Sequence, residues 1–180
     1  QRTPTAQWTA TASGSAVVGM GGSGVHIAAV CFGRINDLGI TDANNMGAAM
    51  APAAADTIAN FLTDTATTPE DYDLIVTGDL SQVGSELLRD LLERKGIKLG
   101  SKHADCGLMM YDREKQDVHA GGSGCGCSAS ILCSYFLSKL EKKELNNLLF
   151  VATGALMSPT SSQQGESIPG IAHLIHLTST

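Results

Sequence analysis

The chain has 180 residues, of which 43% are hydrophobic, enough apolar material for one domain with a substantial core. Its formal net charge is −6 and its lysines and arginines do not cluster, which argues against a nucleic-acid-binding protein. No apolar run approaches the length of a transmembrane segment, and the five cysteines lack the spacing of a disulfide framework or a zinc site.

The chain opens with two short apolar runs, residues 12–19 and 25–32, separated by a glycine-rich stretch at 21–24. This pattern predicts a β-hairpin with a glycine turn. A phosphate-binding glycine loop is the weaker alternative. No Lys-Ser or Lys-Thr follows, and the glycines lead into another strand-like run instead of a helix.

Helical and strand-like periods alternate from there on. Apolar residues recur at helical spacing over 47–63, and Pro69 ends that region. Residues 74–76 form a continuous apolar run, which is typical of a strand covered on both faces. Ser81 is expected to be the N-cap of a second helix, and Gly96 can end that helix.

The second half begins with a polar, irregular segment at 101–120, for which no element is predicted. A glycine-rich run at 121–126 leads into a third helix, and residues 148–152 read as another buried strand. A long polar loop at 158–170 precedes a final strand at 171–177. The sequence therefore predicts an α/β fold with a mixed sheet sandwiched by helices, whose antiparallel members are the hairpin and the final pair of strands.

Three stretches resemble the stage V sporulation protein AD family, and the whole chain aligns in order with the C-terminal half of that family. They are PTAQWTATASGSAVVG at 4–19, HAGGSGCGCSAS at 119–130 and VATGALMSPTSSQQGESIPGIAH at 151–173. The resemblance implies a thiolase-like fold, in which two similar halves bury a ligand pocket between them. We therefore expect residues 1–180 to be a single thiolase-like C-terminal domain and a fragment of a longer, two-half protein.

The resemblance also identifies the positions where thiolase-like enzymes keep their catalytic groups. An acid–base histidine would follow the strand at 74–76, but Gly78 stands there. Asp79 could accept a proton, although a carboxylate beside a thiol raises the pKa of the thiol and opposes its activation. The second position, at 121–124, has neither asparagine nor histidine, and His119 just upstream is the one residue that could substitute. We expect no catalytic residues and no acyltransferase activity.

Two polar stretches are candidates for ligand binding. The glycines at 121–126 would place backbone N–H groups at the positive end of a helix dipole, which favours an anion, or would only let helix and sheet pack closely. The loop at 158–167 is either a pocket wall or partner contact, or a solvent loop. The candidate ligand-binding residues are Thr77, Asp79, His119, Gly121, Gly122, Ser123, Ser158, Thr160, Ser161, Gln163 and Gln164.

The function that the resemblance implies is non-catalytic binding of dipicolinic acid, alone or as its calcium chelate, for uptake into the developing spore. One alternative is a degenerate acyl-CoA acyltransferase whose nucleophile and base come from the other half. Another is an interaction module that assembles the spore dipicolinate channel.

The expected partners are dipicolinic acid, other stage V sporulation channel proteins, the N-terminal half of the same fold and, in a homodimer, a second copy. No nucleic acid or cofactor is expected. No metal is expected either, because His103, Asp105 and Cys106 have no fourth ligand at a typical spacing. The expected location is the cytoplasm or the periphery of the spore inner membrane.

Overall fold

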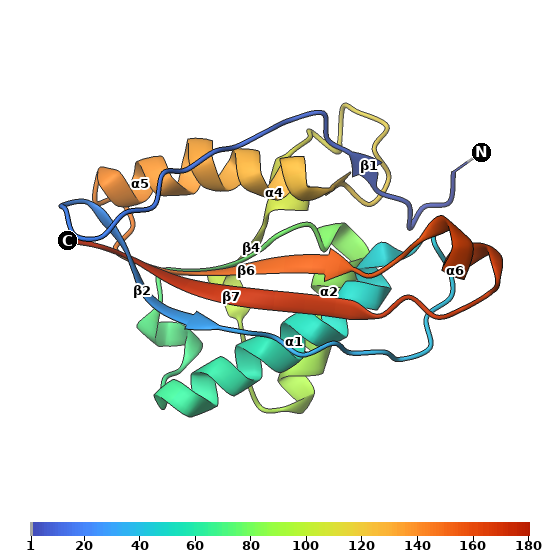
Figure 1. Ribbon diagram of the computed structural model, residues 1–180, viewed down its shortest axis with the longest axis horizontal. Coiled ribbons are helices and arrows are strands. Elements are labelled where there is room, and N and C mark those ends of the chain that lie inside the picture. The colour runs from blue at the N-terminus through green and yellow to red at the C-terminus, as the bar shows by residue number, and fades with distance from the viewer. Residues whose placement is uncertain (1) are drawn as a thin grey trace.

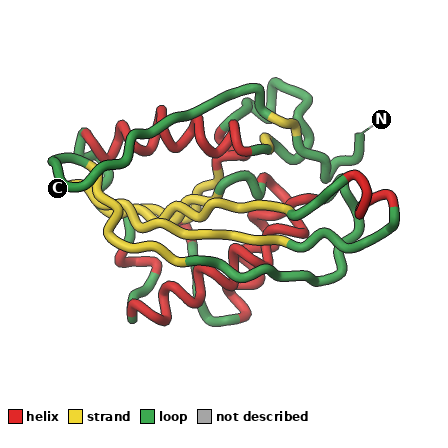
Figure 2. Tube along the Cα trace, in the orientation of Figure 1, coloured by secondary structure: helices red, strands yellow, loops and turns green. Residues whose placement is uncertain are grey.

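Apolar runs form the centre of a five-stranded sheet that lies between two helical layers in the computed structural model, which describes residues 2–180 (Figures 1 and 2). In sheet order the strands are β2 (Val25–Cys31), β7 (Gly170–Ser179), β6 (Asn147–Ala155), β3 (Leu74–Thr77) and β4 (His103–Asp105). β3 is parallel to β4 and β6, whereas β7 is antiparallel to β6 and β2. The α/β fold with a mixed sheet is confirmed.

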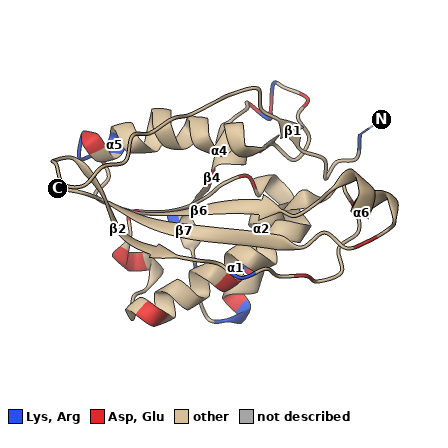
Figure 3. Cartoon of the chain, viewed as in Figure 1, with Lys and Arg blue, Asp and Glu red and all other residues tan. Residues whose placement is uncertain are grey.

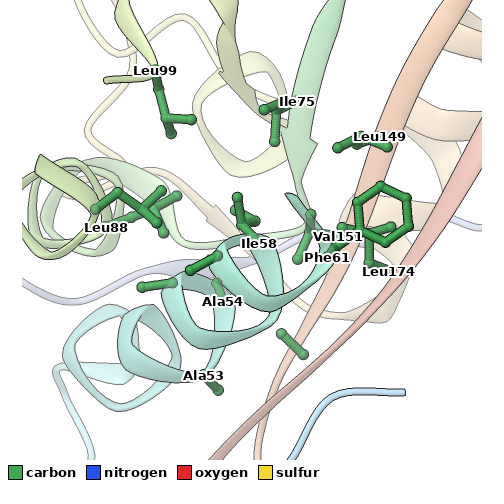
Figure 4. Close-up of a cluster of buried hydrophobic side chains, with 14 of the residues drawn as sticks. Ala53, Ala54, Ile58, Phe61, Ile75, Leu88, Leu99, Leu149, Val151 and Leu174 are labelled. Carbon is green, nitrogen blue, oxygen red and sulfur yellow. The ribbon is translucent and has the colours of Figure 1, made fainter. Parts of the chain in front are cut away.

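One helical layer consists of α1 (Met46–Thr65) and α2 (Ser81–Arg94), which cover the same face of the sheet. Small residues let the two helices approach closely, since a Cβ atom at Gly47 would lie 2.7 Å from the backbone nitrogen of Gly84. The core beneath them is aliphatic, and Figure 4 shows Ile58 of α1, Leu88 of α2 and Ile75 of β3 meeting in it. Both helices were predicted from their apolar spacing, and both are confirmed.

The opposite layer consists of α4 (Cys125–Ile131) and α5 (Leu137–Glu141), joined by a π-helical turn over Leu132–Phe136. Phe136 and Leu140 pack fully buried against Val76 and Leu148 of the sheet. The central strands β3 and β6 are therefore covered on both faces, as their continuous apolar runs predict. The helix that follows the glycine run is also confirmed.

The predicted hairpin is wrong. Residues 12–19 form no strand, and β2 pairs with β7 instead. The early segment runs along α4 (dark blue in Figure 1), where a Cβ atom at Gly14 would lie 2.2 Å from the carbonyl oxygen of Ala129. Close packing of small residues against a helix thus replaces the expected strand pairing.

Two segments without a predicted element contain regular structure. The segment at 101–120 contains β4 and the short helix α3 (Cys106–Met109), and a 3₁₀ turn at Gly100–Lys102 precedes β4. The polar loop at 158–170 contains α6 (Pro159–Gln163). A two-stranded sheet pairs β1 (Trp8–Thr9) with β5 (Gly122–Ser123). A 3₁₀ turn at Pro69–Asp71 follows α1.

Ser81 is not the N-cap of α2 but its first residue, with a φ of +54°. The helix start is capped from a neighbouring strand, because the Asp105 carboxylate accepts the N–H groups of Leu80 and Ser81, each at 2.9 Å. The Ser81 hydroxyl is then free to donate to the carbonyl oxygen of Gly122 at 2.6 Å.

Apart from Asp105 on β4, the Lys, Arg, Asp and Glu side chains lie in loops and on the helices, and none lies on β2, β6 or β7 (Figure 3). In residues 2–180, no helix has both the length and the apolar character that crossing a membrane requires.

Candidate functional site

The carboxyl end of β3 leads into a tightly packed turn at Gly78. A Cβ atom at this position would lie 2.7 Å from Thr153 Oγ1 and 2.9 Å from Ser128 Oγ, both closer than real Cβ contacts allow. Gly78 is buried between β6 and α4. A side chain at the position that would carry a catalytic imidazole would therefore have to displace the Thr153 and Ser128 hydroxyls.

Asp79 joins three elements beside that turn. Its carboxylate accepts hydrogen bonds from Thr153 Oγ1 at 2.8 Å and from the Gly124 N–H at 2.7 Å, with Ser123 Oγ at 3.4 Å. The Asp79 N–H in turn donates to Thr153 Oγ1 at 3.0 Å. The negative group at the start of α4 is thus the protein's own carboxylate.

The glycine run is engaged in backbone pairing. The carbonyl oxygen of Gly121 accepts the Trp8 N–H at 2.8 Å, and that of Ser123 accepts the Ala10 N–H at 2.9 Å. A Cβ atom at Gly122 would lie 2.9 Å from Met110 Cβ. Of the two interpretations of this run, the geometry favours close packing of backbone against backbone for Gly121 and Gly122, while the Ser123 side chain remains beside Asp79.

Thr77 belongs to a buried polar network and does not face a cavity. Its hydroxyl donates to Asp105 Oδ2 at 2.6 Å and lies 3.0 Å from His103 Nε2. Burial raises the pKa of Asp105 to about 6, although the Thr77 hydroxyl and three backbone N–H groups act in the opposite direction. Burial, together with the neighbouring Arg89 guanidinium, lowers the pKa of His103 to about 4.

The buried thiols near this network are unsuited to nucleophilic chemistry. Burial raises the pKa of Cys127 to about 12, and the Asp79 and Asp105 carboxylates add to the effect. Burial also raises the pKa of Cys106 far above its ordinary value. A neutral solution therefore leaves both as thiols.

The remaining predicted residues lie apart from this cluster. His119 has a φ of +50°, and its Nε2 lies 3.6 Å from Asp117 Oδ1. Ser158 caps α6 by accepting the Ser161 N–H at 3.1 Å. The other predicted residues of that loop are exposed, and they are Thr160, Gln163 and Gln164. Within residues 2–180, no hydrogen bond connects any of these six side chains to Asp79 or Ser123.

A polar cavity of about 350 Å³ lies next to Asp79, between the N-terminal segment, β5 and the start of α1. Gln7 forms part of its wall and donates from Nε2 to the Asp79 carbonyl oxygen at 2.7 Å. Gln7 Oε1 is buried and has no hydrogen-bond partner among the described residues. The lining residues are Arg2, Ala6, Gln7, Thr9, Ala43, Asn44, Met46 and Ser123.

Of the predicted residues, only Ser123 lines this cavity. Sequence reasoning missed Arg2, Gln7 and Asn44, because neither Arg2 nor Asn44 belongs to a recognisable motif and Asn44 lies 37 positions beyond Gln7 along the chain. The one available signal was Arg2 itself, since residues 3–33 contain no charged side chain. In the part of the chain that the structure describes, no three His, Cys, Asp or Glu side chains are placed to hold a metal ion.

Comparison with known proteins gives a family match over nearly the whole chain. The profile of the family described as stage V sporulation protein AD matches residues 1–178. The stage V sporulation protein AD of Bacillus subtilis (strain 168) is 50% identical over 173 residues, which cover 96% of this chain and 51% of the relative. The chain thus spans about half the length of this curated relative.

Two solved structures are also similar. A tetronic acid condensing enzyme has 14% identity and a TM-score of 0.46, with 89% of this chain and 49% of that chain covered. The 3-oxoacyl-(acyl-carrier-protein) synthase III of Aquifex aeolicus VF5 has 16% identity and a TM-score of 0.41, with 73% and 39% covered. Likenesses of this strength carry no conclusion about the activity of this chain.

Proposed function

The chain belongs to the stage V sporulation protein AD family, and on that premise we propose that it is a non-catalytic binding protein for dipicolinic acid during spore formation. The ligand is a small, planar molecule with two carboxylates. The binding surface lies at the carboxyl ends of β3 and β6 and in the polar cavity beside them. The rest of the whole protein contributes to the same pocket.

The observation that carries this proposal is the packing at Gly78. An acyl-transfer enzyme needs a base beside its nucleophile. Here a side chain of any size at position 78 would collide with Thr153 and Ser128. The nearest carboxylate, Asp79, is already engaged by Thr153 and by the Gly124 N–H. Binding without turnover is the function that remains compatible with this arrangement.

A second proposed role is contact with another part of the whole protein or with channel proteins. The observation that favours it is a group of apolar side chains that are largely exposed, among them Val17, Met20 and Phe32 at 103%, 103% and 84% exposure. Large apolar side chains that a folded domain leaves exposed are a feature of interaction surfaces. This role is compatible with ligand binding, and it supports the proposal that the cavity is completed elsewhere in the protein.

Isothermal titration calorimetry tests the proposal directly. Dipicolinate, with and without calcium, is titrated into the 180-residue chain and into a form joined to the part of the Bacillus subtilis relative that this chain does not match. Saturable heat in the joined form is the expected result. Silence in both forms, with retained capture of channel proteins, would leave only the interaction role. Release of free CoA from acetyl-CoA would overturn the non-catalytic proposal.

A further inference from the structure

We propose that Asp105 is a positioning residue of the binding surface. Its buried carboxylate holds the turn that carries Asp79 and, through that turn, the strand β5 that carries Ser123. This inference rests on the proposed function and assigns a role to a residue of β4 that lies outside the polar cavity. Because Asp105 is only 1% exposed, it acts on the binding surface through other residues.

One oxygen of the carboxylate holds the turn on both sides of Asp79. Asp105 Oδ2 accepts the Thr77 hydroxyl at 2.6 Å and the Leu80 N–H at 2.9 Å. Thr77 precedes the turn at the end of β3, and Leu80 follows Asp79 at the start of α2. Because both flanks of the turn are bound to the same atom, the place of Asp79 between them depends on the Asp105 side chain.

The other oxygen joins this turn to a second helix. Asp105 Oδ1 accepts the N–H groups of Ser81 and Leu108, at 2.9 and 3.1 Å. Ser81 begins α2 and Leu108 lies in α3, so one oxygen serves the starts of two helices. With two donors on each oxygen, the carboxylate has a full set of partners without water, which a charge buried to this degree requires.

Ser81 connects the turn to β5. Its φ of +54° is a conformation that residues other than glycine rarely adopt and that is concentrated at functional sites. With this backbone, its N–H donates towards β4 while its hydroxyl donates to the Gly122 carbonyl oxygen at 2.6 Å. The Gln82 N–H donates to the Ala120 carbonyl oxygen at 2.9 Å. Two hydrogen bonds from α2 thus hold the segment that leads into Ser123.

The turn and β5 meet at the binding surface. The Asp79 carboxylate accepts the Gly124 N–H at 2.7 Å, and the Asp79 carbonyl oxygen accepts Gln7 Nε2 at 2.7 Å. Gln7 and Ser123 both line the cavity. The start of a helix is ordinarily capped by a polar side chain of its own segment, which needs no charge buried in a neighbouring strand. The carboxylate on β4 therefore does more than cap α2, since it sets the places of the groups around the cavity.

Two substitutions separate the two steps of this pathway. In Asp105→Asn, the amide oxygen can keep the N–H groups of α2 and α3, but the amide nitrogen then faces the Leu80 N–H and the turn is released. In Ser81→Ala, only the link to β5 is lost. The control Asp73→Asn changes a carboxylate that accepts two backbone N–H groups at the opposite end of β3. The control Ser85→Ala removes a buried hydroxyl of α2 that has no hydrogen-bond partner among the described residues.

Calorimetry with dipicolinate on the joined form measures binding. Amide hydrogen exchange of the 180-residue chain, followed by NMR, measures the placement through the N–H groups of Asp79 and Gly124, neither of which donates to a substituted side chain. Asp105→Asn is expected to weaken binding about tenfold and Ser81→Ala about threefold. In both variants the two amides are expected to exchange faster relative to those of β6. Both controls are expected to bind and exchange like the parent.

Circular dichroism must show that each variant is folded, and if Asp105→Asn is not, Ser81→Ala decides alone. The inference is overturned if the two amides exchange as in the controls, or if dipicolinate binds the variants as tightly as the controls. In either case, binding to the parent leaves the proposed function standing. If dipicolinate binds no form while exchange at the two amides rises only in the two variants, the proposed function fails and the positioning role stands.

Discussion

The pair His103 and Asp105 gives a prediction that can be worked out from the structure. Both side chains contact the Thr77 hydroxyl, and their exposed fractions are only 8% and 1%. Burial shifts the two pKa values in opposite directions, that of Asp105 from 3.8 to about 6 and that of His103 from 6.5 to about 4. The two groups therefore make opposite contributions to the pH dependence of folding.

The sign follows from proton linkage. The raised pKa of Asp105 gives stability that is present below pH 3.8 and is lost as the pH rises through about 6. The lowered pKa of His103 gives stability that is present above pH 6.5 and is lost as the pH falls towards about 4. At 1.36 kcal/mol per pKa unit, each contribution is on the order of 3 kcal/mol. Between pH 4 and 6 the two nearly cancel.

Single substitutions break this cancellation. His103→Gln leaves the Asp105 contribution alone, so the variant is expected to gain roughly 2 kcal/mol, relative to the parent, between pH 6.5 and pH 4.5. Asp105→Asn leaves the His103 contribution alone, so that variant is expected to lose a similar amount over the same interval. The measurement is the free energy of unfolding by urea, followed by circular dichroism at both pH values.

The double variant His103→Gln/Asp105→Asn is the control, and its pH dependence should match that of the parent. Other titrating groups contribute equally to all four proteins, so only the differences between them matter. Two single variants with the same pH dependence as the parent would show that the buried network does not titrate as argued.

Two further predictions concern packing and thiol chemistry. Gly78→Ala is expected to lower the free energy of unfolding by about 1–3 kcal/mol through overpacking, whereas Gly19→Ala, with no atom within 4 Å of its Cβ, should leave urea denaturation nearly unchanged. Cys125 is exposed and should react with a thiol reagent in the native protein, whereas Cys106 and Cys127 should react only after denaturation, as absorbance of the released thiolate would report. Rapid native reaction of Cys127 would contradict the burial described above.

The elements predicted correctly are those in which buried apolar residues determine the sequence pattern. β3 and β6 are continuous apolar strands, and α1 and α2 carry apolar stripes at helical spacing. β4 was missed because it has three residues and two of them, His103 and Asp105, are polar. Those side chains can be buried because groups on other segments satisfy them, among them the Thr77 hydroxyl and, for Asp105, the N–H groups of Leu80 and Ser81. A contact between strands cannot be seen in a local pattern.

The candidate site was predicted only in outline. The absence of a base at position 78 was clear from the residue itself, but the lack of space around it comes from Thr153 and Ser128 on other elements. The cavity was not foreseen, because Gln7 and Ser123 come together only through the pairing of β1 with β5. Two-residue strands leave no periodic signal.

The lack of backbone hydrogen bonds in the segment that runs along α4 affects its dynamics. In the described chain, residues 11–23 donate no backbone hydrogen bond, although Gly14 is pressed against the helix. Contact alone holds this stretch in place, so it can lift away without breaking any link in a hydrogen-bonded ladder. Its amide protons would then exchange with solvent almost as fast as those of an unfolded chain, while the amides of β6 beneath stay protected. This stretch is therefore closely packed at Gly14, exposed over most of its length and weak in cooperativity.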